Sequence, residues 1–439
     1  MLEFNPMTPP DAPDFSDPWL GSSHKGYPRT QPARRRSDVG SAGWNVLAGD
    51  LPLPLAVLKR EALAHNIAWM QAQADAWGVS FAPHGKTTMS PQLFARQLDA
   101  GAWGITFATV TQLEVGVAAG ARRALIANQV LGDEDLGGIQ RLLRAHDGLR
   151  IVFLVDSLAQ LALIDDWAAR HDGSVPFEVL LEIGVDGART GVRTQAQAIA
   201  LARALHASPA VRLVGIECYE GQGATGDDAG DRAYVDALMD RVDAIAREAV
   251  AHGWFEGDEV LVSAGGSAVY DLVSARLVPA IGKPVRGLLR SGCYVTHDHG
   301  TYRRYQASID ARLRCAASES LRAALEVWTV VQSCPEPGLA LVSMGKRDVS
   351  FDLAMPVPIA RAARGARATS PVPASWHVTA LNDQHGYLRW DAADAALAPV
   401  VGERIGFGIS HPCTTFDKWQ WMPVVEQDYR VSDAVVMHF

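Results

Sequence analysis

IVFLVDSLAQLALIDDWAARH, residues 151–171, joins a short apolar run to a longer amphipathic one and sets the plan for much of the chain. The run at 151–156 is β-branched and aromatic, and its apolar residues are nearly continuous. This pattern is typical of a strand that helices cover on both faces. The Ala- and Leu-rich residues that follow predict a helix. A strand followed by a helix is the repeating unit of a parallel sheet.

Seven further runs of this kind are separated by helical patterns. They are VSFAPH (79–84), ITFAT (105–109), ALIAN (124–128), VLLEIG (179–184), VGIECY (214–219), VLVSAGG (260–266) and GLLRSG (287–292). Eight strand–helix units predict an α/β fold of the (β/α)8 barrel type. A doubly wound open sheet is the alternative. It is disfavoured because no GxGxxG follows the first strand.

The rest of the chain differs in pattern from the barrel segment. The 439 residues are too many for one ordinary core, so two domains are expected. Beyond about residue 300, short apolar segments closely spaced by turns predict a β-rich second domain. We therefore divide the chain into a mostly irregular N-terminal extension (1–50), a barrel (51–300) and a β-rich domain (301–439).

Charge and cysteine content limit the classes of protein that the chain can belong to. The net charge of 40 − 49 = −9 disfavours a nucleic-acid partner, and the basic run at 34–37 is expected to be solvated. Five scattered cysteines without CxxC indicate a reducing compartment and no disulfide framework. No apolar stretch is long enough to span a bilayer, and no signal peptide is visible. These features predict a soluble cytoplasmic protein without a membrane partner.

Lys86 in FAPHGKTTMSP (81–91) is the first candidate for chemistry. It follows the first barrel strand, on the face where barrel enzymes place their active sites. A lysine there can form a Schiff base with an aldehyde cofactor when burial or neighbouring charges depress its pKa. Taken alone, an exposed loop lysine is the simpler interpretation.

Two glycine-containing turns are candidates for binding a phosphate group. SAGGS (263–267) follows the seventh strand and RSG (290–292) follows the eighth. Barrels often bind phosphate with these two loops, where glycine lets the backbone approach the anion. Arg189 and Tyr219 follow the fifth and sixth strands and could contact the cofactor or be structural.

A histidine and a cysteine near the C-terminus form a candidate metal site. His411 and Cys413 lie in ISHPCTTFDKWQW (409–421). On an extended strand, residues two apart leave the same face, so both side chains would point one way. A thiolate and an imidazole suit zinc. Taken alone, a buried cysteine beside a packed histidine explains the pattern better.

Six motifs in order resemble the D-serine dehydratase and D-threonine aldolase family, relatives of bacterial alanine racemase. They are PHGKT, ARTGV, GIECYEG, AGGS, RSGCYVTHD and HPCTTFDKW. The resemblance covers residues 51 to the end and implies the same barrel with a β-rich domain. It implies that Lys86 carries pyridoxal phosphate (PLP) and that His411 and Cys413 bind the metal. The residues that it places around the PLP ring and phosphate are Arg189, Tyr219, Gly265, Gly266, Ser267 and Tyr294.

The resemblance also implies an activity. Within the family, His-x-Cys is associated with zinc and dehydration, and His-x-Asp with manganese and aldol cleavage; zinc is therefore expected ahead of Mn²⁺ or Mg²⁺. The expected reaction is β-elimination from a 3-hydroxy-D-amino acid, with D-serine as the leading substrate, in a homodimer. The alternatives are D-threonine or 3-hydroxy-D-aspartate aldolase, D-threo-3-hydroxyaspartate dehydratase, and a non-catalytic PLP carrier. Asp383 and Gln384, where relatives often have an acidic pair, leave the substrate open.

Overall fold

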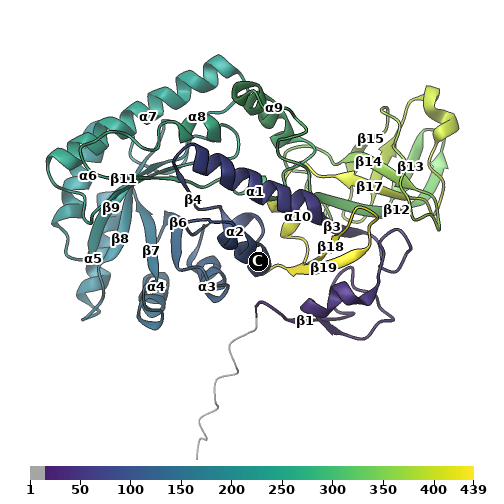
Figure 1. The fold of residues 1–439 in the computed structure, drawn as a ribbon, viewed down its shortest axis with the longest axis horizontal. Coiled ribbons are helices and arrows are strands. Elements are labelled where there is room, and N and C mark those ends of the chain that lie inside the picture. Colours follow the sequence, from purple (N-terminus) through teal and green to yellow (C-terminus); the bar gives the residue numbers. More distant parts are fainter. Residues whose placement is uncertain (1–14) are drawn as a thin grey trace, which may run out of the picture.

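The computed structural model describes residues 15–439 as two packed bodies, a helix-covered barrel and a β-rich domain (Figure 1). The first fourteen residues, where the sequence shows no signal peptide, lie outside the described part. Within residues 15–439, no helix combines the length and the apolar character needed to cross a membrane.

Eight parallel strands form the barrel, in the order β4-β11-β10-β9-β8-β7-β6-β5. A parallel bridge between His84 and Thr106 joins the two outer strands of this order and closes the ring. The strands are β4 (Ser80–Phe81), β5 (Ile105–Phe107), β6 (Arg123–Gln129), β7 (Arg150–Val155), β8 (Phe177–Ile183), β9 (Val211–Cys218), β10 (Val260–Ala264) and β11 (Val285–Leu289). Each of them overlaps one of the eight predicted runs, so the predicted α/β barrel is confirmed.

Helices follow the strands and cover the outside of the barrel (Figure 1). They are α1 (Arg60–Ala76), α2 (Pro91–Asp99), α3 (Val110–Ala118), α4 (Asp133–Ala145), α5 (Leu158–Ala169), α6 (Gln195–Ala207), α7 (Asp228–Ala251), α8 (Tyr270–Ser274) and α9 (Thr301–Leu313). Three of them start at a hydroxyl residue, Thr109, Ser157 or Thr194, whose side chain accepts a backbone N–H of the first turn. Such caps satisfy donors that the helix itself cannot pair.

The inside of the barrel is filled by apolar side chains. They form one buried cluster that includes Leu125, Leu154, Leu180, Leu261 and Leu288. Because side chains of a strand alternate in direction, their neighbours along each strand pack against the outer helices instead. The polar residues at the carboxyl ends of the strands therefore lie next to the apolar interior of the barrel.

The β-rich domain is built on a second sheet, in the order β15-β16-β13-β12-β3-β18-β19; in addition, β17 pairs with β12, and β14 pairs with β17. Its strands after the barrel are β12 (Leu325–Glu336), β13 (Leu339–Val342), β14 (Val357–Ala362), β15 (His377–Leu381), β16 (Gly386–Arg389), β17 (Arg404–Gly408), β18 (Trp421–Val425) and β19 (Val431–Val436). The predicted β-rich character is confirmed.

One strand of this second sheet comes from the N-terminal side of the barrel. β3 (Leu55–Lys59) pairs antiparallel with β12 and parallel with β18. The chain thus starts in the second sheet, makes the barrel and returns. Residues 55–58, which fall within the 51–300 segment, are apolar and buried, and their local pattern alone does not reveal which sheet they join.

Residues 15–50 contain little regular structure but are fastened to the C-terminal strand. β1 (Trp19–Leu20) and β2 (Arg34–Arg35) form a two-stranded sheet, and the 3-10 helix η1 (Arg36–Ala42) follows. Arg36, from the basic run, binds Asp433 of β19 at 3.1 Å. This arginine is therefore an internal contact, whereas the sequence predicted a solvated run.

A buried histidine just before α9, His297, is expected to make the fold sensitive to acid. Burial, followed by the charges of His299 and Arg303, lowers the pKa of His297 to about 3. The folded pKa lies below the unfolded value of about 6.5, so His297 stabilises the fold above pH 6.5 and this contribution is lost as the pH falls. The loss from this residue is about 2 kcal/mol at pH 5.

We expect His297→Asn to reduce the acid sensitivity of folding, measured by urea unfolding at pH 7.5 and pH 5. His297 has a φ of +48°, a left-handed conformation that asparagine tolerates. The difference in unfolding free energy between the two pH values should shrink by about 2 kcal/mol. His377→Asn, at an exposed position of β15, is the control. Equal pH dependence in both variants would contradict the assignment.

Candidate active site and metal group

A cavity of about 250 Å³ opens at the carboxyl ends of the barrel strands. Its polar lining comes from loops that follow different strands, which is the usual place for a barrel active site. The residues that matter for its chemistry are Lys86, Arg189, Glu217, Tyr219, Gly265 and Arg290. The structure therefore brings together four of the residues predicted from the sequence, namely Lys86, Arg189, Tyr219 and Gly265.

Lys86 lies in the 3-10 helix η2 (Gly85–Thr87), directly after β4. Burial lowers the pKa of its amine; the charge of Cys413 opposes this shift, and that of Arg189 adds to it. A lowered pKa increases the fraction of neutral, nucleophilic amine near pH 7. His84, on the same loop, has a buried Nδ1 without a hydrogen-bond partner among residues 15–439, so the cavity offers an unused polar group.

Arg290 and Glu217 form a buried ion pair in the lining of the cavity. The guanidinium donates to the Glu217 carboxylate at 2.7 Å, and it also donates to the Ser263 hydroxyl. Arg290 is only 3% exposed. Burial raises the pKa of Glu217 to about 7, although the charge of Arg290 opposes this rise. The sequence assigned RSG (290–292) to phosphate binding and did not anticipate this pair.

The turn after β10 binds an anionic group. Gly265 and Gly266 donate their backbone N–H groups to the carboxylate of Glu220, at 3.0 and 2.6 Å. Gly265 has a φ of +129°, and a Cβ there would lie 2.8 Å from the backbone nitrogen of Arg290. Only glycine fits this close approach. The turn thus offers paired N–H donors that can bind an anionic group, which here is the Glu220 carboxylate; the phosphate role predicted for SAGGS stays a prediction.

Of the other residues predicted to contact the cofactor, Arg189 and Tyr219 line the cavity, whereas Tyr294 is buried in the core beside it. Arg189 lies over the ring of Tyr219, with its Cζ 4.3 Å from the ring centroid, which is a cation–π contact. Ser267 follows Gly266 in the turn. Tyr294 is buried beside Phe81, and its hydroxyl accepts a hydrogen bond from Gln97 at 2.9 Å. It is therefore a core residue next to the site, and its contact with a cofactor stays a prediction.

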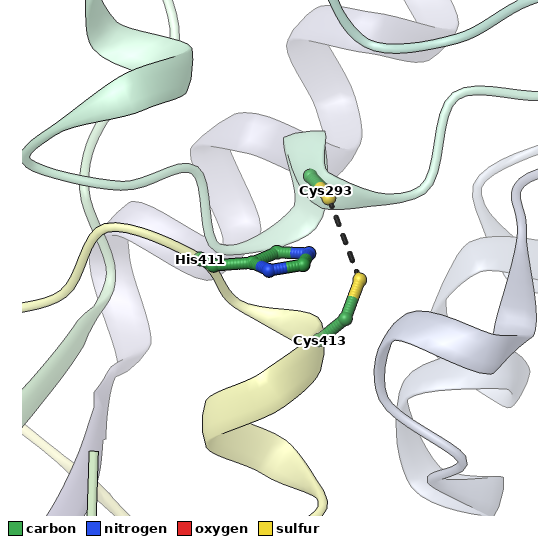
Figure 2. Close-up of side chains that lie close together, drawn as sticks. All are labelled: Cys293, His411 and Cys413. Atoms are coloured by element: carbon green, nitrogen blue, oxygen red, sulfur yellow. Dashed lines mark hydrogen bonds between the residues drawn. The ribbon is translucent and has the colours of Figure 1, made fainter. Parts of the chain in front are cut away.

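A group of three potential metal ligands lies at the junction of the two domains. The ligand atoms of Cys293, His411 and Cys413 all lie within 4.8 Å of one another. Figure 2 shows that the cysteine of the barrel segment and the pair of the C-terminal segment point toward one another. We call these three residues the metal group.

The backbone around His411 and Cys413 differs from the expected extended strand. His411 lies in the loop after β17, and Cys413 begins the short helix α10 (Cys413–Phe416). The two side chains converge because the chain turns into a helix at Pro412. The strand geometry inferred from the spacing is therefore wrong, although the predicted proximity of the two side chains is found.

Residues around the metal group orient its members. Asp352 lies 2.5 Å from Nδ1 of His411, which leaves Nε2 free to bind an ion. Burial disfavours the charged imidazole, but hydrogen bonds and charges from Cys413 and Asp352 outweigh it and raise the pKa of His411 to about 9. Hydrogen bonds from Cys293 and His411 hold the pKa of Cys413 well below its usual value. A thiolate beside an imidazole suits zinc.

The metal group and the cavity are neighbours in one chain. Sγ of Cys413 lies 3.4 Å from the hydroxyl of Thr87, the residue after Lys86. The charge of Cys413 is also the largest opposing influence on the pKa of Lys86. The C-terminal domain of the chain therefore brings its metal group next to the Lys86 loop of its own barrel.

Sequence reasoning missed two members of this arrangement. Cys293 is one of the five scattered cysteines, and Asp352 lies in GKRDVSFD (345–352), a segment for which the sequence predicts no role. The signal that could have found Cys293 is its place in RSGCYVTHD, directly after the eighth barrel strand. Asp352 carries no local signal, because its partner His411 is 59 residues away.

The fold and the site define a barrel protein of the alanine racemase type with a second, ligand-bearing β-rich domain. The family model of the alanine racemase N-terminal domain matches residues 58–276, and that of a serine dehydratase domain matches residues 324–425. The chain carries both of these domains, in agreement with its resemblance to the D-serine dehydratase and D-threonine aldolase family.

Relatives with different activities are similar to this chain. D-threonine aldolase of Arthrobacter sp. is 27% identical over 372 residues, 85% of this chain and 88% of the relative. The structure of D-threonine aldolase from Filomicrobium marinum superimposes with a TM-score of 0.72 at 25% identity, covering 88% of this chain and 95% of the other.

A dehydratase structure is similar as well. D-threo-3-hydroxyaspartate dehydratase from Delftia sp. HT23 has a TM-score of 0.68 at 26% identity, covering 90% of this chain and 99% of the other. Two variant structures of a D-threo-3-hydroxyaspartate dehydratase replace a histidine and, two positions later, a cysteine by alanine. The cysteine variant is described as the metal-free form.

Proposed function

We propose that the protein is a PLP- and zinc-dependent dehydratase that removes the β-hydroxyl of a 3-hydroxy-D-amino acid, with D-serine as substrate and pyruvate and ammonia as products. The observation that carries this proposal is the position of Lys86. Its amine lies in a cavity at the carboxyl ends of the barrel strands, and its neighbour Thr87 contacts Cys413 of the metal group.

The residues of the cavity fit PLP, the cofactor that the family implies. Lys86 would hold the aldehyde. The paired N–H groups of Gly265 and Gly266, which bind the carboxylate of Glu220, are suited to an anionic phosphate. Arg189 and Arg290 add positive charge to the lining. When bound, PLP supplies an electron sink for the pair left on Cα after proton removal.

Lys86 is the group in the cavity best suited to move the Cα proton. Its lowered pKa favours the neutral amine, which can accept a proton near neutral pH. Arg290, held by Glu217, is fixed in the lining and contributes a constant positive charge. The apolar floor of the barrel excludes water from the opposite side, which strengthens these electrostatic interactions.

His411 and Cys413 would hold the zinc ion beside this base. A bound zinc acts as a Lewis acid that stabilises the departing hydroxide by several kcal/mol. Asp352 orients the imidazole for this role. The elimination removes one water from D-serine, and hydrolysis of the resulting enamine yields pyruvate and ammonia without further help from the protein.

The charges around the metal group favour a substrate with an uncharged side chain. Asp352 contacts His411, and the charges of Asp352 and Cys413 raise the pKa of Asp417 after burial. The negative charge of these two carboxylates beside the metal group would disfavour the second carboxylate of a 3-hydroxyaspartate. D-serine has no such group, and we therefore place it ahead of 3-hydroxy-D-aspartate.

Aldol cleavage is the second candidate, because the relative that covers 85% of this chain is a D-threonine aldolase. The spacing of His411 and Cys413 favours dehydration, since the same spacing of histidine and cysteine occurs in the D-threo-3-hydroxyaspartate dehydratase variants. The homodimer expected from the resemblance stays a prediction.

Product analysis of the PLP-loaded protein tests the proposal. With D-serine we expect pyruvate and ammonia in equal amounts, and with D-threonine 2-oxobutyrate and ammonia. A chelator should stop the reaction while the PLP absorbance remains, and zinc should restore it. Glycine and an aldehyde as products would establish the aldolase, and PLP binding without turnover of any D-amino acid would indicate a carrier. Full activity after metal removal would reject the zinc role.

A further inference from the structure

We propose that Cys293 is a third protein ligand of the metal, so that the site has two thiolates and one imidazole and selects a thiophilic ion. This inference rests on the proposed metal role of His411 and Cys413, and it adds a residue from the barrel to the pair from the C-terminal domain. Neither the sequence motif nor the spacing of that pair assigns a role to this cysteine.

The separation of the two sulfur atoms supports a shared ion. Sγ of Cys293 lies 3.6 Å from Sγ of Cys413. Two thiolates that each lie about 2.3 Å from one tetrahedral zinc are about 3.8 Å apart. The imidazole completes a triangle whose ligand atoms lie within 4.8 Å of one another. The three side chains thus surround a common point, as Figure 2 shows.

The backbone holds Cys293 firmly in this place. Cys293 begins the 3-10 helix η3 (Cys293–Val295), and its carbonyl accepts the N–H of His297 at 2.8 Å. The preceding Gly292 packs so closely on η2 that a Cβ would lie 2.5 Å from Thr87 Oγ1 and 2.8 Å from the His84 carbonyl oxygen. The loop with Cys293 and the loop with Lys86 are therefore packed as one unit, and the thiol has little freedom to turn away.

Each member of the metal group also has a partner that is not itself a ligand. His411 contacts Asp352 and Cys413 contacts Thr87. The side chain of Tyr302 on α9 lies beside Cys293. Such outer partners orient the ligands of metal sites, and they come here from three different segments. A cysteine that only filled space would not need one.

A donor set of two thiolates and one imidazole has two chemical consequences. Two thiolates neutralise the charge of a divalent ion, which suits a group whose cysteines are both mostly buried. Soft sulfur also favours Zn²⁺, Co²⁺ and Cd²⁺ over Mn²⁺ and Mg²⁺. Three protein ligands leave one tetrahedral position for the substrate hydroxyl, which is the arrangement of a catalytic zinc site.

Cobalt substitution measures the number of thiolate ligands without relying on activity. The full-length protein, with its PLP fixed by borohydride reduction, is loaded with one Co²⁺ per chain. We expect thiolate-to-cobalt charge-transfer absorbance in the near ultraviolet, after the spectrum of the metal-free protein is subtracted. In Cys293→Ser this absorbance should fall to about half, because one of two Co–S bonds is lost. Cys334→Ser, at an exposed position of β12, should leave the spectrum unchanged. Full wild-type absorbance per bound cobalt in Cys293→Ser would overturn the proposal.

Competition between Cd²⁺ and Mn²⁺ for the site is a second measurement, and it remains informative when a variant binds both ions more weakly. In Cys293→Asp, a harder ligand replaces the thiolate, and the preference for Cd²⁺ over Mn²⁺ should fall by at least about tenfold. An unchanged preference would overturn the role of Cys293 while leaving His411 and Cys413 as ligands. Failure of the wild-type protein to bind any of these ions would instead overturn both this inference and the metal role in the proposed function.

Discussion

Replacing Lys86 with alanine is expected to lower the turnover of D-serine by at least about 10³-fold, because the base that takes the Cα proton and the anchor of the cofactor are lost together. Lys86 is the lysine that lines the cavity, and burial lowers the pKa of its amine. Borohydride reduction of the PLP-loaded wild-type protein should fix the cofactor to the peptide that contains Lys86. The alanine variant should show no such labelled peptide.

Two further variants show whether the effect belongs to the amine or to the charge. Lys86→Arg keeps a positive charge and should be as inactive as the alanine variant, because a guanidinium neither anchors the aldehyde nor takes up a proton near neutral pH. Lys283→Ala removes an amine that donates to the carbonyl of Phe255. Lys283 precedes β11, at the end of the barrel opposite Lys86, so this variant should retain activity. A labelled peptide from any other part of the protein would contradict the assignment.

Replacing His411 with alanine is expected to remove the bound metal and to lower turnover by at least about 10²-fold, because the leaving hydroxide loses its Lewis acid. The PLP absorbance should stay, since His411 does not line the cavity in which Lys86 lies. Elemental analysis of the purified variant measures the metal, and absorbance measures the cofactor in the same sample.

Asp352→Asn is expected to weaken metal binding less than His411→Ala does. Asp352 contacts His411 without being placed to bind the ion itself, and loss of such a partner costs about 10–100-fold in metal affinity. Added zinc should therefore restore the activity of Asp352→Asn but not that of His411→Ala. Asp417→Asn removes a carboxylate that pairs with Lys418 rather than with His411, and it should keep wild-type affinity. Loss of PLP together with the metal in His411→Ala would mean that the variant is misfolded or that the two sites are not separate.

The barrel was predictable because its evidence is local. Each βα unit, such as residues 151–171, carries its own apolar run and its own amphipathic helix, and neighbouring units pair in chain order around the ring. The order of the loops at one end of the barrel follows from the parallel strands. Lys86, Arg189, Tyr219 and Gly265 could therefore be placed at the same end from the sequence alone.

The second sheet was predictable only in type. The strand β3 is an apolar run like those of the barrel, yet it lies between β12 and β18. Its partners are more than 260 residues away, and no local pattern specifies them. The same holds for the extension, whose Arg36 binds Asp433 of β19. Long-range pairing depends on how complementary surfaces pack, which periodicity does not record.

By itself, the sequence determined the eight strand–helix units, the β-rich character of the remainder and the end of the barrel at which Lys86 lies, since these follow from short-range periodicity and parallel strand direction. Only the tertiary structure decided that Cys293 lies beside His411 and Cys413, that Asp352 contacts the imidazole, and that Cys413 lies next to the Lys86 loop. The physical reason is distance along the chain: Cys293 and Cys413 are 120 residues apart, and their sulfur atoms meet because two domains pack through β3 and the loops around η2.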